Sequence, residues 1–243
     1  MNKRKSPRFV SGFLVKLKTK IMYNIHSVLI EQHHLKHHRS ETPSKVHLLL
    51  THGAGASTSH SFFTQLISSL TRKGCHVWTF DFAYMVQALT EKKRRPPPRL
   101  PVLENEYIAI HNAVREIIGS DQLWIGGKSM GGRVACHVAN DIANINNIGG
   151  VIALGYPFHP VGKPEKLRLD VLQASLLPVF ICQGERDAFG NKSEINTYTI
   201  PANIHIKHVI DGDHSFSPRK SSGRDIIDNI NEVAEAIALF VAT

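Results

Sequence analysis

One short stretch decides the fold that this sequence predicts: residues 123–133 read LWIGGKSMGGR. The apolar residues before the glycines have the composition of a buried strand, and apolar side chains recur at helical spacing from Met130 onward. Between them lies the pattern G-x-S-x-G with Ser129 at its centre. A sharp turn from strand to helix exposes a serine hydroxyl, glycines relieve the crowding, and the helix N-terminus stabilises negative charge. The stretch therefore predicts a nucleophilic serine on an α/β scaffold.

The same alternation of strand and helix patterns continues from residue 46 onward. Strands are expected at residues 46–51, 76–80, 123–125, 150–154, 179–183 and 206–210, and helices at residues 62–73, 103–118, 130–142 and 226–241. This rhythm is typical of a mostly parallel central sheet with helices on both faces. Two charged connections, residues 91–101 and 157–168, should be loops. We expect one α/β domain at residues 46–243. Residues 1–45 before it should form a basic leader and an additional strand that precedes the strand at residues 46–51.

The net charge of +9 is concentrated at the N-terminus. Residues 1–21 contain no acid and seven bases, which are Lys3, Arg4, Lys5, Arg8, Lys16, Lys18 and Lys20. Without them the net charge is only +2, so we expect no nucleic-acid partner. No stretch predicts a transmembrane segment, and the short apolar run at residues 9–15 lacks the features of a secretory signal. A disordered leader is favoured over an organelle presequence or a membrane-surface helix.

Cysteines and histidines give little sign of a metal site. The chain has three cysteines, Cys75, Cys136 and Cys182. Their odd number and apolar surroundings predict buried, reduced thiols and a cytoplasmic location. Four histidines cluster before the first long strand, at His33, His34, His37 and His38. They show no open-site pattern, so a solvated cluster is favoured, and neither a metal nor a cofactor is expected.

A serine nucleophile needs a histidine base and an acid, which α/β proteins of this kind supply later in the chain in the order Ser, Asp, His. Asp187 and His214 each follow an expected strand. Since the carboxyl ends of parallel strands meet at one edge of the sheet, both should approach Ser129. Singly, Asp187 also fits a turn cap and His214 a surface loop. Together they favour a catalytic triad, with Glu185 as the alternative acid.

Stabilising a tetrahedral oxyanion requires two N–H donors beside the serine. The backbone N–H of Met130 is expected to supply one. The other is expected from Gly53 and Ala54, in the glycine-rich loop after the strand at residues 46–51. The alternative for that loop is a plain turn. A nucleotide-binding phosphate loop is disfavoured. Such a loop needs a glycine five positions before Gly127, and that position is occupied by Gln122.

Six segments together resemble a small subfamily of the α/β-hydrolase superfamily, shared by bacterial proteins, a testis-expressed human protein and a subunit of a chromatin acetyltransferase complex. They read HGAG (52–55), KRRPPP (93–98), GGKSMGGR (126–133), GYPFHP (155–160), QGERD (183–187) and DGDHSF (211–216). The chain is more distantly similar to dienelactone-hydrolase-like enzymes. The resemblance covers residues 46–241 and implies an α/β-hydrolase fold. Because some relatives are parts of protein assemblies, it does not by itself imply catalysis.

The first hypothesis is a cofactor-free serine hydrolase of the carboxylesterase or thioesterase type, cleaving an ester, thioester or related acyl bond of a small molecule. The second is a non-catalytic scaffold that binds a protein partner through the same loops. Bases in the two charged loops would favour an anionic substrate, with ordinary solvated charge as the alternative. The candidate substrate-binding residues are Arg94, Arg95, His159 and Lys163.

Overall fold

Seven strands form one sheet in the order β1-β3-β2-β4-β5-β6-β7 in the computed structural model, which describes residues 32–142 and 148–242. The strands are β1 (Lys36–His38), β2 (Val46–Thr51), β3 (His76–Phe80), β4 (Gln122–Lys128), β5 (Ile148–Leu154), β6 (Val179–Gly184) and β7 (Ile204–Val209). Strand β1 pairs with β3 antiparallel, and all other neighbours are parallel. The mostly parallel sheet that the sequence predicts is confirmed.

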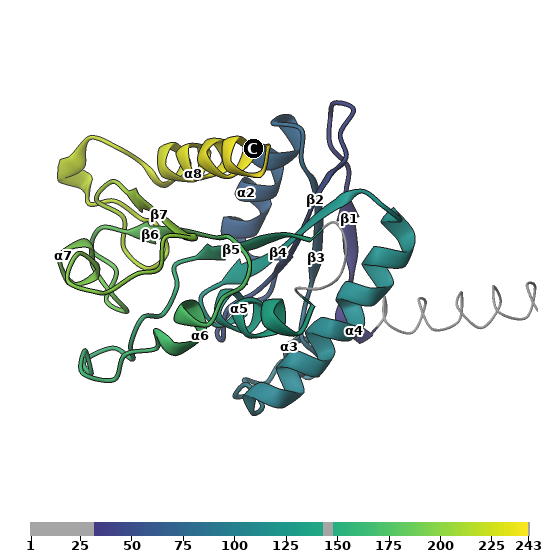
Figure 1. Ribbon diagram of the computed structural model, residues 1–243, viewed down its shortest axis with the longest axis horizontal. Coiled ribbons are helices and arrows are strands. Elements are labelled where there is room, and N and C mark those ends of the chain that lie inside the picture. Colours follow the sequence, from purple (N-terminus) through teal and green to yellow (C-terminus); the bar gives the residue numbers. More distant parts are fainter. Residues whose placement is uncertain (1–31, 143–147, 243) are drawn as a thin grey trace, which may run out of the picture.

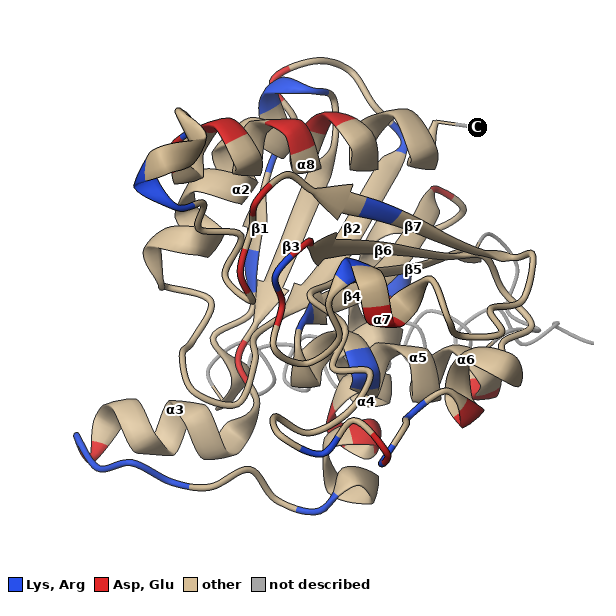
Figure 2. Ribbon diagram, turned by 90° about the vertical axis from the view of Figure 1, so that its left-hand side faces the viewer, with Lys and Arg blue, Asp and Glu red and all other residues tan. Residues whose placement is uncertain are grey.

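Helices cover both faces of this sheet (Figure 1). On one face α2 (Ser61–Arg72) packs against α8 (Ile226–Val241), and on the other α4 (Leu100–Ile118) packs against α5 (Met130–Ile142). Figure 2 shows the same layers from the side. The connections hold the shorter α3 (Ala83–Thr90), α6 (Asp170–Gln173) and α7 (Lys192–Ile195) and the 3-10 turn η1 (Lys220–Ser222).

The core has two halves because the central strands are buried on both faces. In β2, Leu49 joins the apolar cluster under α4 and α5, whereas Leu48 and Leu50 join the cluster under α2 and α8. Successive side chains of a strand point to opposite faces, so a strand covered on both sides reads as a continuous apolar run. That run is the signal from which the sequence predicts β2 with its observed ends.

The prediction departs from the structure where local signals are weak. Helix α3 was not predicted, because residues 83–90 are few and no side-chain cap marks their start. Strand β4 continues through Gly126 and Gly127 beyond the predicted residue 125. Glycine usually weakens a strand, but a Cβ at Gly126 would lie 2.1 Å from the carbonyl oxygen of Ile152 on the neighbouring strand. Gly126 therefore permits the close approach of β4 and β5.

The order of the strands places a crevice at the carboxyl ends of β2 and β4. From β2 the chain passes through α2 to β3 on one side, then returns through α3 and α4 to β4 on the other side of β2. In α/β sheets such a reversal of strand order opens a binding crevice between the loops that follow the two strands. Here these loops are residues 52–60, after β2, and the turn at Ser129, after β4.

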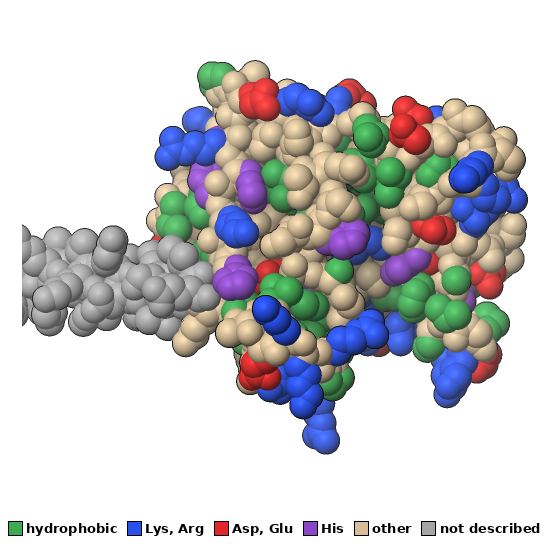
Figure 3. All heavy atoms as spheres, turned by 180° about the vertical axis from the view of Figure 1, so that it is seen from behind, with side chains coloured by type: hydrophobic (Ala, Val, Ile, Leu, Met, Phe, Trp, Pro, Cys, Tyr) green, Lys and Arg blue, Asp and Glu red, His purple; other side chains and the backbone are tan. Residues whose placement is uncertain are grey.

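All three cysteines are free and buried, as predicted. No helix in residues 32–142 or 148–242 is long and apolar enough to cross a membrane. Residues 1–31, which hold most of the predicted basic leader, lie outside the described residues. Both signs of charge occur over the face drawn in Figure 3, with Lys and Arg side chains most concentrated along its lower border.

Candidate active site

Ser129 forms the turn between β4 and α5. Its φ of 53° lies in the left-handed region, which is unfavourable for a residue with a side chain. Two backbone bonds hold the turn: the N–H of Ser129 donates to the Leu154 carbonyl at 2.9 Å, and the N–H of Arg133 donates to the Ser129 carbonyl at 3.0 Å. The strained turn directs the serine hydroxyl outward at the carboxyl edge of the sheet.

The glycines beside Ser129 are required by the close packing of the loop after β2. A Cβ at Gly127 would lie 2.6 Å from the carbonyl oxygen of Thr51, and one at Gly131 would lie 2.5 Å from that of His52. Real side chains do not come this close to backbone. The two small residues therefore let the turn at Ser129 sit directly against the neighbouring loop.

The three side chains predicted to act together lie in hydrogen-bond contact. The Oγ of Ser129 is 2.9 Å from Nε2 of His214, and Nδ1 of His214 is 2.7 Å from Oδ2 of Asp187. Asp187 is fully buried, while the side chain of His214 is 26 % exposed. With the proton on Nδ1 donated to Asp187, Nε2 is free to accept the hydroxyl proton of Ser129. This is the relative placement of a nucleophile, a base and an orienting acid.

Further hydrogen bonds hold the Asp187 carboxylate in place. The N–H of Phe189 donates to Oδ1 at 2.8 Å, and Nε2 of Gln183 donates to Oδ2 at 2.9 Å. Sequence reasoning did not single out Gln183, although it ends an apolar strand four positions before Asp187. The alternative acid, Glu185, has other partners: it accepts from Nζ of Lys192 at 2.9 Å and from the N–H of Asp211 at 3.0 Å.

Lys128, which precedes the serine, is a second residue that sequence reasoning missed. Its Nζ donates to the backbone carbonyl of His214, and it lies 5.7 and 5.5 Å from the ring centres of Phe62 and Phe216. Burial lowers the pKa of Lys128 to about 8. The side chain therefore connects the serine turn to the loop that carries His214. Its signal in the sequence is a lysine within a turn otherwise made of small and apolar residues.

Two of the residues predicted to stabilise an oxyanion, Met130 and Gly53, lie next to Ser129. Met130 is the first residue of α5, so its N–H has no acceptor within the helix. A Cβ at Gly53 would lie 3.4 Å from Cβ of Ser129, which places the loop after β2 against the serine. His52 holds this loop: its Nδ1 donates to the Gly53 carbonyl at 2.6 Å, and its Nε2 accepts from the N–H of Phe82 at 3.0 Å.

A cavity of about 590 Å³ opens in front of Ser129 and His214. The loop after β2, including Ala54, lines part of it. Much of the remaining wall is apolar and consists of Phe62, Phe63, Phe189 and Ile226. A substrate with an apolar portion would fit beside the serine hydroxyl.

The candidate substrate-binding residues separate into two groups. Arg94 and Arg95 line a second cavity, of about 510 Å³, next to the first. His159 is only 2 % exposed, and its Nδ1 donates to the carbonyl of Pro160 at 2.9 Å. Lys163 is exposed on the loop at residues 157–168. Neither His159 nor Lys163 lines either cavity.

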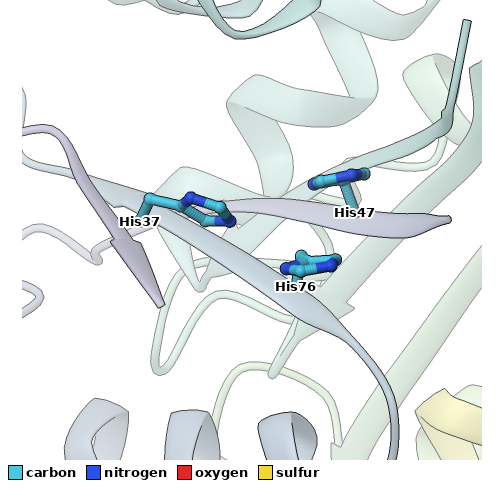
Figure 4. Close-up of side chains that lie close together, drawn as sticks. All are labelled: His37, His47 and His76. Atoms are coloured by element: carbon cyan, nitrogen blue, oxygen red, sulfur yellow. The ribbon is translucent and has the colours of Figure 1, made fainter. Parts of the chain in front are cut away.

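Three histidines converge at the opposite edge of the sheet, where β2 and β3 begin (Figure 4). One ring nitrogen from each of His37, His47 and His76 lies within 4.8 Å of the other two. Only His37 belongs to the histidine cluster noted in the sequence. The Nδ1 of His47 accepts from Nε1 of Trp78 at 3.1 Å, and the Nδ1 of His76 accepts from the N–H of Ser40 at 3.1 Å.

These two hydrogen bonds oppose metal binding. A neutral imidazole whose Nδ1 accepts a hydrogen bond has its proton on Nε2, so it has no lone pair left for a cation. Metal-bound histidines usually show the reverse arrangement, in which the nitrogen away from the metal donates. A metal at His47 and His76 would therefore have to displace both donors.

Comparisons with known proteins agree with this architecture. A family model for the alpha/beta hydrolase domain matches residues 44–242. No curated protein matches the sequence. Three solved structures with a similar fold are an alpha-beta serine hydrolase homologue from Coxiella burnetii, Est1E from Butyrivibrio proteoclasticus and a dienelactone hydrolase from Anabaena variabilis.

Their sequence identities to this chain are 16 %, 12 % and 16 %, with TM-scores of 0.60, 0.63 and 0.60. The similarity covers 84 %, 86 % and 85 % of this chain and 89 %, 93 % and 90 % of theirs, in the same order. At these identities the likeness concerns the fold alone. The family match begins just before β2 and extends past the end of α8, and the chain therefore belongs to the alpha/beta hydrolase family.

Proposed function

We propose that the protein is a serine hydrolase that cleaves an ester, thioester or related acyl bond of a small molecule, with Ser129 as its nucleophile. The observation that carries the proposal is the position of His214, whose two ring nitrogens lie 2.9 Å from Ser129 Oγ and 2.7 Å from Asp187 Oδ2. A buried acid, a histidine and a serine in this sequence of contacts are the groups that activate a hydroxyl for attack on a carbonyl.

In the first half of the reaction, Ser129 Oγ attacks the carbonyl carbon of the substrate while Nε2 of His214 takes the hydroxyl proton. Asp187 holds the imidazole in orientation and stabilises the positive charge that forms on it. The carbonyl oxygen becomes an oxyanion. We assign its stabilisation to the N–H of Met130 and to an N–H of the loop at Gly53 and Ala54, assisted by the N-terminus of α5.

The tetrahedral intermediate then collapses. The bond from the carbonyl carbon to the alcohol or thiol breaks, the leaving group takes the proton from Nε2 of His214, and the acyl group stays on Ser129. A water molecule next gives its proton to His214 and attacks the acyl carbon. Breakdown of this second intermediate releases the carboxylic acid and restores the proton to Ser129, so the step consumes only water.

The fold comparisons support this class of reaction. The neighbours include an alpha-beta serine hydrolase homologue and a dienelactone hydrolase. The apolar wall of the cavity in front of Ser129 supports an acyl substrate with a hydrocarbon portion.

Labelling with a fluorophosphonate probe tests the proposal directly, because such probes react with activated serines. The wild-type protein should be labelled at Ser129, as located by mass spectrometry of its peptides. Ser129→Ala should not be labelled, since it lacks the nucleophile, and His214→Ala should be labelled about a hundredfold more slowly or less, since it lacks the base.

Ser215→Ala is the matched control, because Ser215 lines the same cavity, whereas the hydroxyl against Nε2 of His214 is that of Ser129. It should be labelled like the wild type. Labelling that persists in Ser129→Ala would contradict the assignment of the nucleophile. A folded wild type that no serine-directed probe labels would instead favour a scaffold that binds a protein partner.

A further inference from the structure

The second cavity adjoins the one in front of Ser129. It is formed by the end of α3, the loop that follows α3, and Ala54 and Gly55. Ala54 and Gly55 also line the catalytic cavity. The two cavities thus meet at the loop after β2, which carries one of the proposed oxyanion donors. A substrate long enough to cross this loop would reach both cavities.

Every charged side chain that lines this second cavity is basic. Its lining includes Lys92, Lys93, Arg94 and Arg95. Figure 2 shows these bases, in blue, on the segment that leaves the end of α3. No Asp or Glu is among the described residues that line either cavity. The nearest acid in sequence, Glu91, is bonded to Nη2 of Arg95 at 2.6 Å, so it compensates only one of the four charges.

The basic segment has a constrained backbone. The N–H of Lys93 donates to the Ala88 carbonyl at 3.0 Å, and Lys92 has a φ of 53°, which turns the chain out of the helix. Three prolines, at residues 96–98, follow and restrict the backbone further. Such a segment presents its cations at one place with little loss of chain freedom on binding. In addition, Nε of Arg95 is buried without a hydrogen-bond partner.

The two cavities therefore offer different surroundings to the two ends of one molecule. Beside Ser129 the wall includes Phe62, Phe189 and Ile226, whereas beyond Gly55 it includes Lys93 and Arg94. We propose that the substrate is an acyl ester or thioester that carries a phosphate or carboxylate group, with this anion bound by Lys93 and Arg94. This inference rests on the proposed hydrolase function and names the substrate class. Phosphate and carboxylate both accept charge-assisted hydrogen bonds from such side chains.

Matched thioesters of one acyl group test the inference. Their leaving thiols should end in a phosphate, a carboxylate, a hydroxyl or a trimethylammonium group. We expect kcat/KM for at least one anionic thioester to exceed that for the hydroxyl thioester by about tenfold or more, the effect of one charge-assisted hydrogen bond. The trimethylammonium thioester should be the poorest. The phosphate and carboxylate members identify which anion is bound.

The variant K93Q/R94Q should lose this preference, so that kcat/KM for the anionic thioester falls to about that for the hydroxyl thioester. The matched control is K45Q/R72Q, which removes the same charge. Lys45 and Arg72 are exposed, line neither cavity and lie at the edge of the sheet opposite Ser129. If both double variants lost the preference for the anionic thioester equally, the preference would be a long-range effect of net charge, and the assignment would be overturned.

Failure of this inference can be told apart from failure of the proposed function. If the probe labels Ser129 and the hydroxyl thioester is cleaved as well as the anionic ones, the substrate class is wrong and the hydrolase stands. Calorimetric titration of Ser129→Ala with the phosphate and hydroxyl thioesters gives a readout without turnover. Tighter binding of the phosphate thioester that K93Q/R94Q abolishes supports the anion site, and equal binding of the two thioesters overturns it.

Discussion

Gln183 donates a hydrogen bond to the same carboxylate oxygen of Asp187 that binds His214, at 2.9 Å against 2.7 Å. The Nε2 of Gln183 also lies 3.2 Å from the Tyr156 carbonyl and 3.0 Å from the Gly190 carbonyl. All three partners are acceptors, so the amide must point its NH2 group, and not its oxygen, toward them. Because Gln183 is fully buried, this geometry is fixed by packing as well. Gln183 is thus a positioning residue for the acid.

Gln183→Leu should lower kcat for ester cleavage by about tenfold or more, with little change in KM, because Asp187 loses a donor worth about 1.5–3 kcal/mol and holds the imidazole less well. Steady-state kinetics on a neutral ester measures both constants. Gln173→Leu, at an exposed position of α6, is the control and should behave like the wild type. An unchanged kcat in a folded Gln183→Leu protein would show that the other hydrogen bonds to Asp187 are enough to position it without Gln183.

Gly131→Ala should destabilise the fold by about 2 kcal/mol or more, although alanine is normally the better helix former. The reason is the 2.5 Å approach of its Cβ to the His52 carbonyl oxygen, which would push the loop after β2 away from Ser129. Urea unfolding measures the difference in free energy. Gly55→Ala provides the comparison, since a Cβ there has no atom within 4 Å and should change stability by less than about 1 kcal/mol. Similar stability of the two variants would argue against the close packing.

Lys128 should make stability depend on pH in the alkaline range. Its pKa is lowered by burial to about 8 in the folded protein, against an ordinary value of 10.5. Between these two pH values Lys128 binds more protons in the unfolded chain than in the folded protein, so the stability of the folded protein rises with pH. The wild type should therefore gain stability relative to Lys128→Met, by up to about 3 kcal/mol, as pH increases through this window. Urea unfolding of both proteins at several pH values tests this, and a constant difference would contradict it.

His37 should make the folded protein less stable in acid. Partial desolvation of the ring and the neighbouring His76, His47 and Arg39 lower its pKa from 6.5 to about 4. Below the ordinary value the unfolded chain takes up a proton that the folded protein does not, so stability falls as pH drops from 6.5 toward 4.

Replacing His37 by phenylalanine removes this titration and keeps an aromatic ring on Trp78, on which His37 stacks with a 4.0 Å centroid separation. His37→Phe should accordingly lose less stability than the wild type over the same pH range, as measured by thermal unfolding. If the two proteins respond to acid in parallel, another group must carry the dependence. His47 is the first to consider, because burial and His76 lower its pKa as well, although Asp121 acts against this.

Much of the fold could be predicted from local patterns. Strands β2 and β3 and helices α5 and α8 have the bounds that their apolar periodicity indicates. A strand or helix signal lies within a few consecutive residues, so it can be detected without knowing what packs on the element. Ser129, Asp187 and His214 were also selected this way, because their order and their positions after strands follow from the topology of a parallel sheet, and the three side chains lie in hydrogen-bond contact.

The residues that hold the site together could not be predicted. Lys128 meets the carbonyl of His214, 86 positions further along the chain, and His52 meets the N–H of Phe82, 30 positions away. Nothing in the sequence near either residue indicates its partner. The two charged loops show the same limit. In sequence Arg94 and Lys163 were equivalent candidates, but of these two only Arg94 lines the cavity that adjoins the one in front of Ser129.

The sequence by itself determined the class of fold, the serine at the strand-to-helix turn and the order in which Asp187 and His214 follow it, because these depend on periodicity and on short local motifs. Only the tertiary structure decided which polar side chains support Asp187 and His214 and which cations line the cavity that adjoins the one in front of Ser129. Those contacts join segments brought together by the order of strands in the sheet, and a hydrogen bond or ion pair depends on distances of a few ångströms that local sequence does not encode.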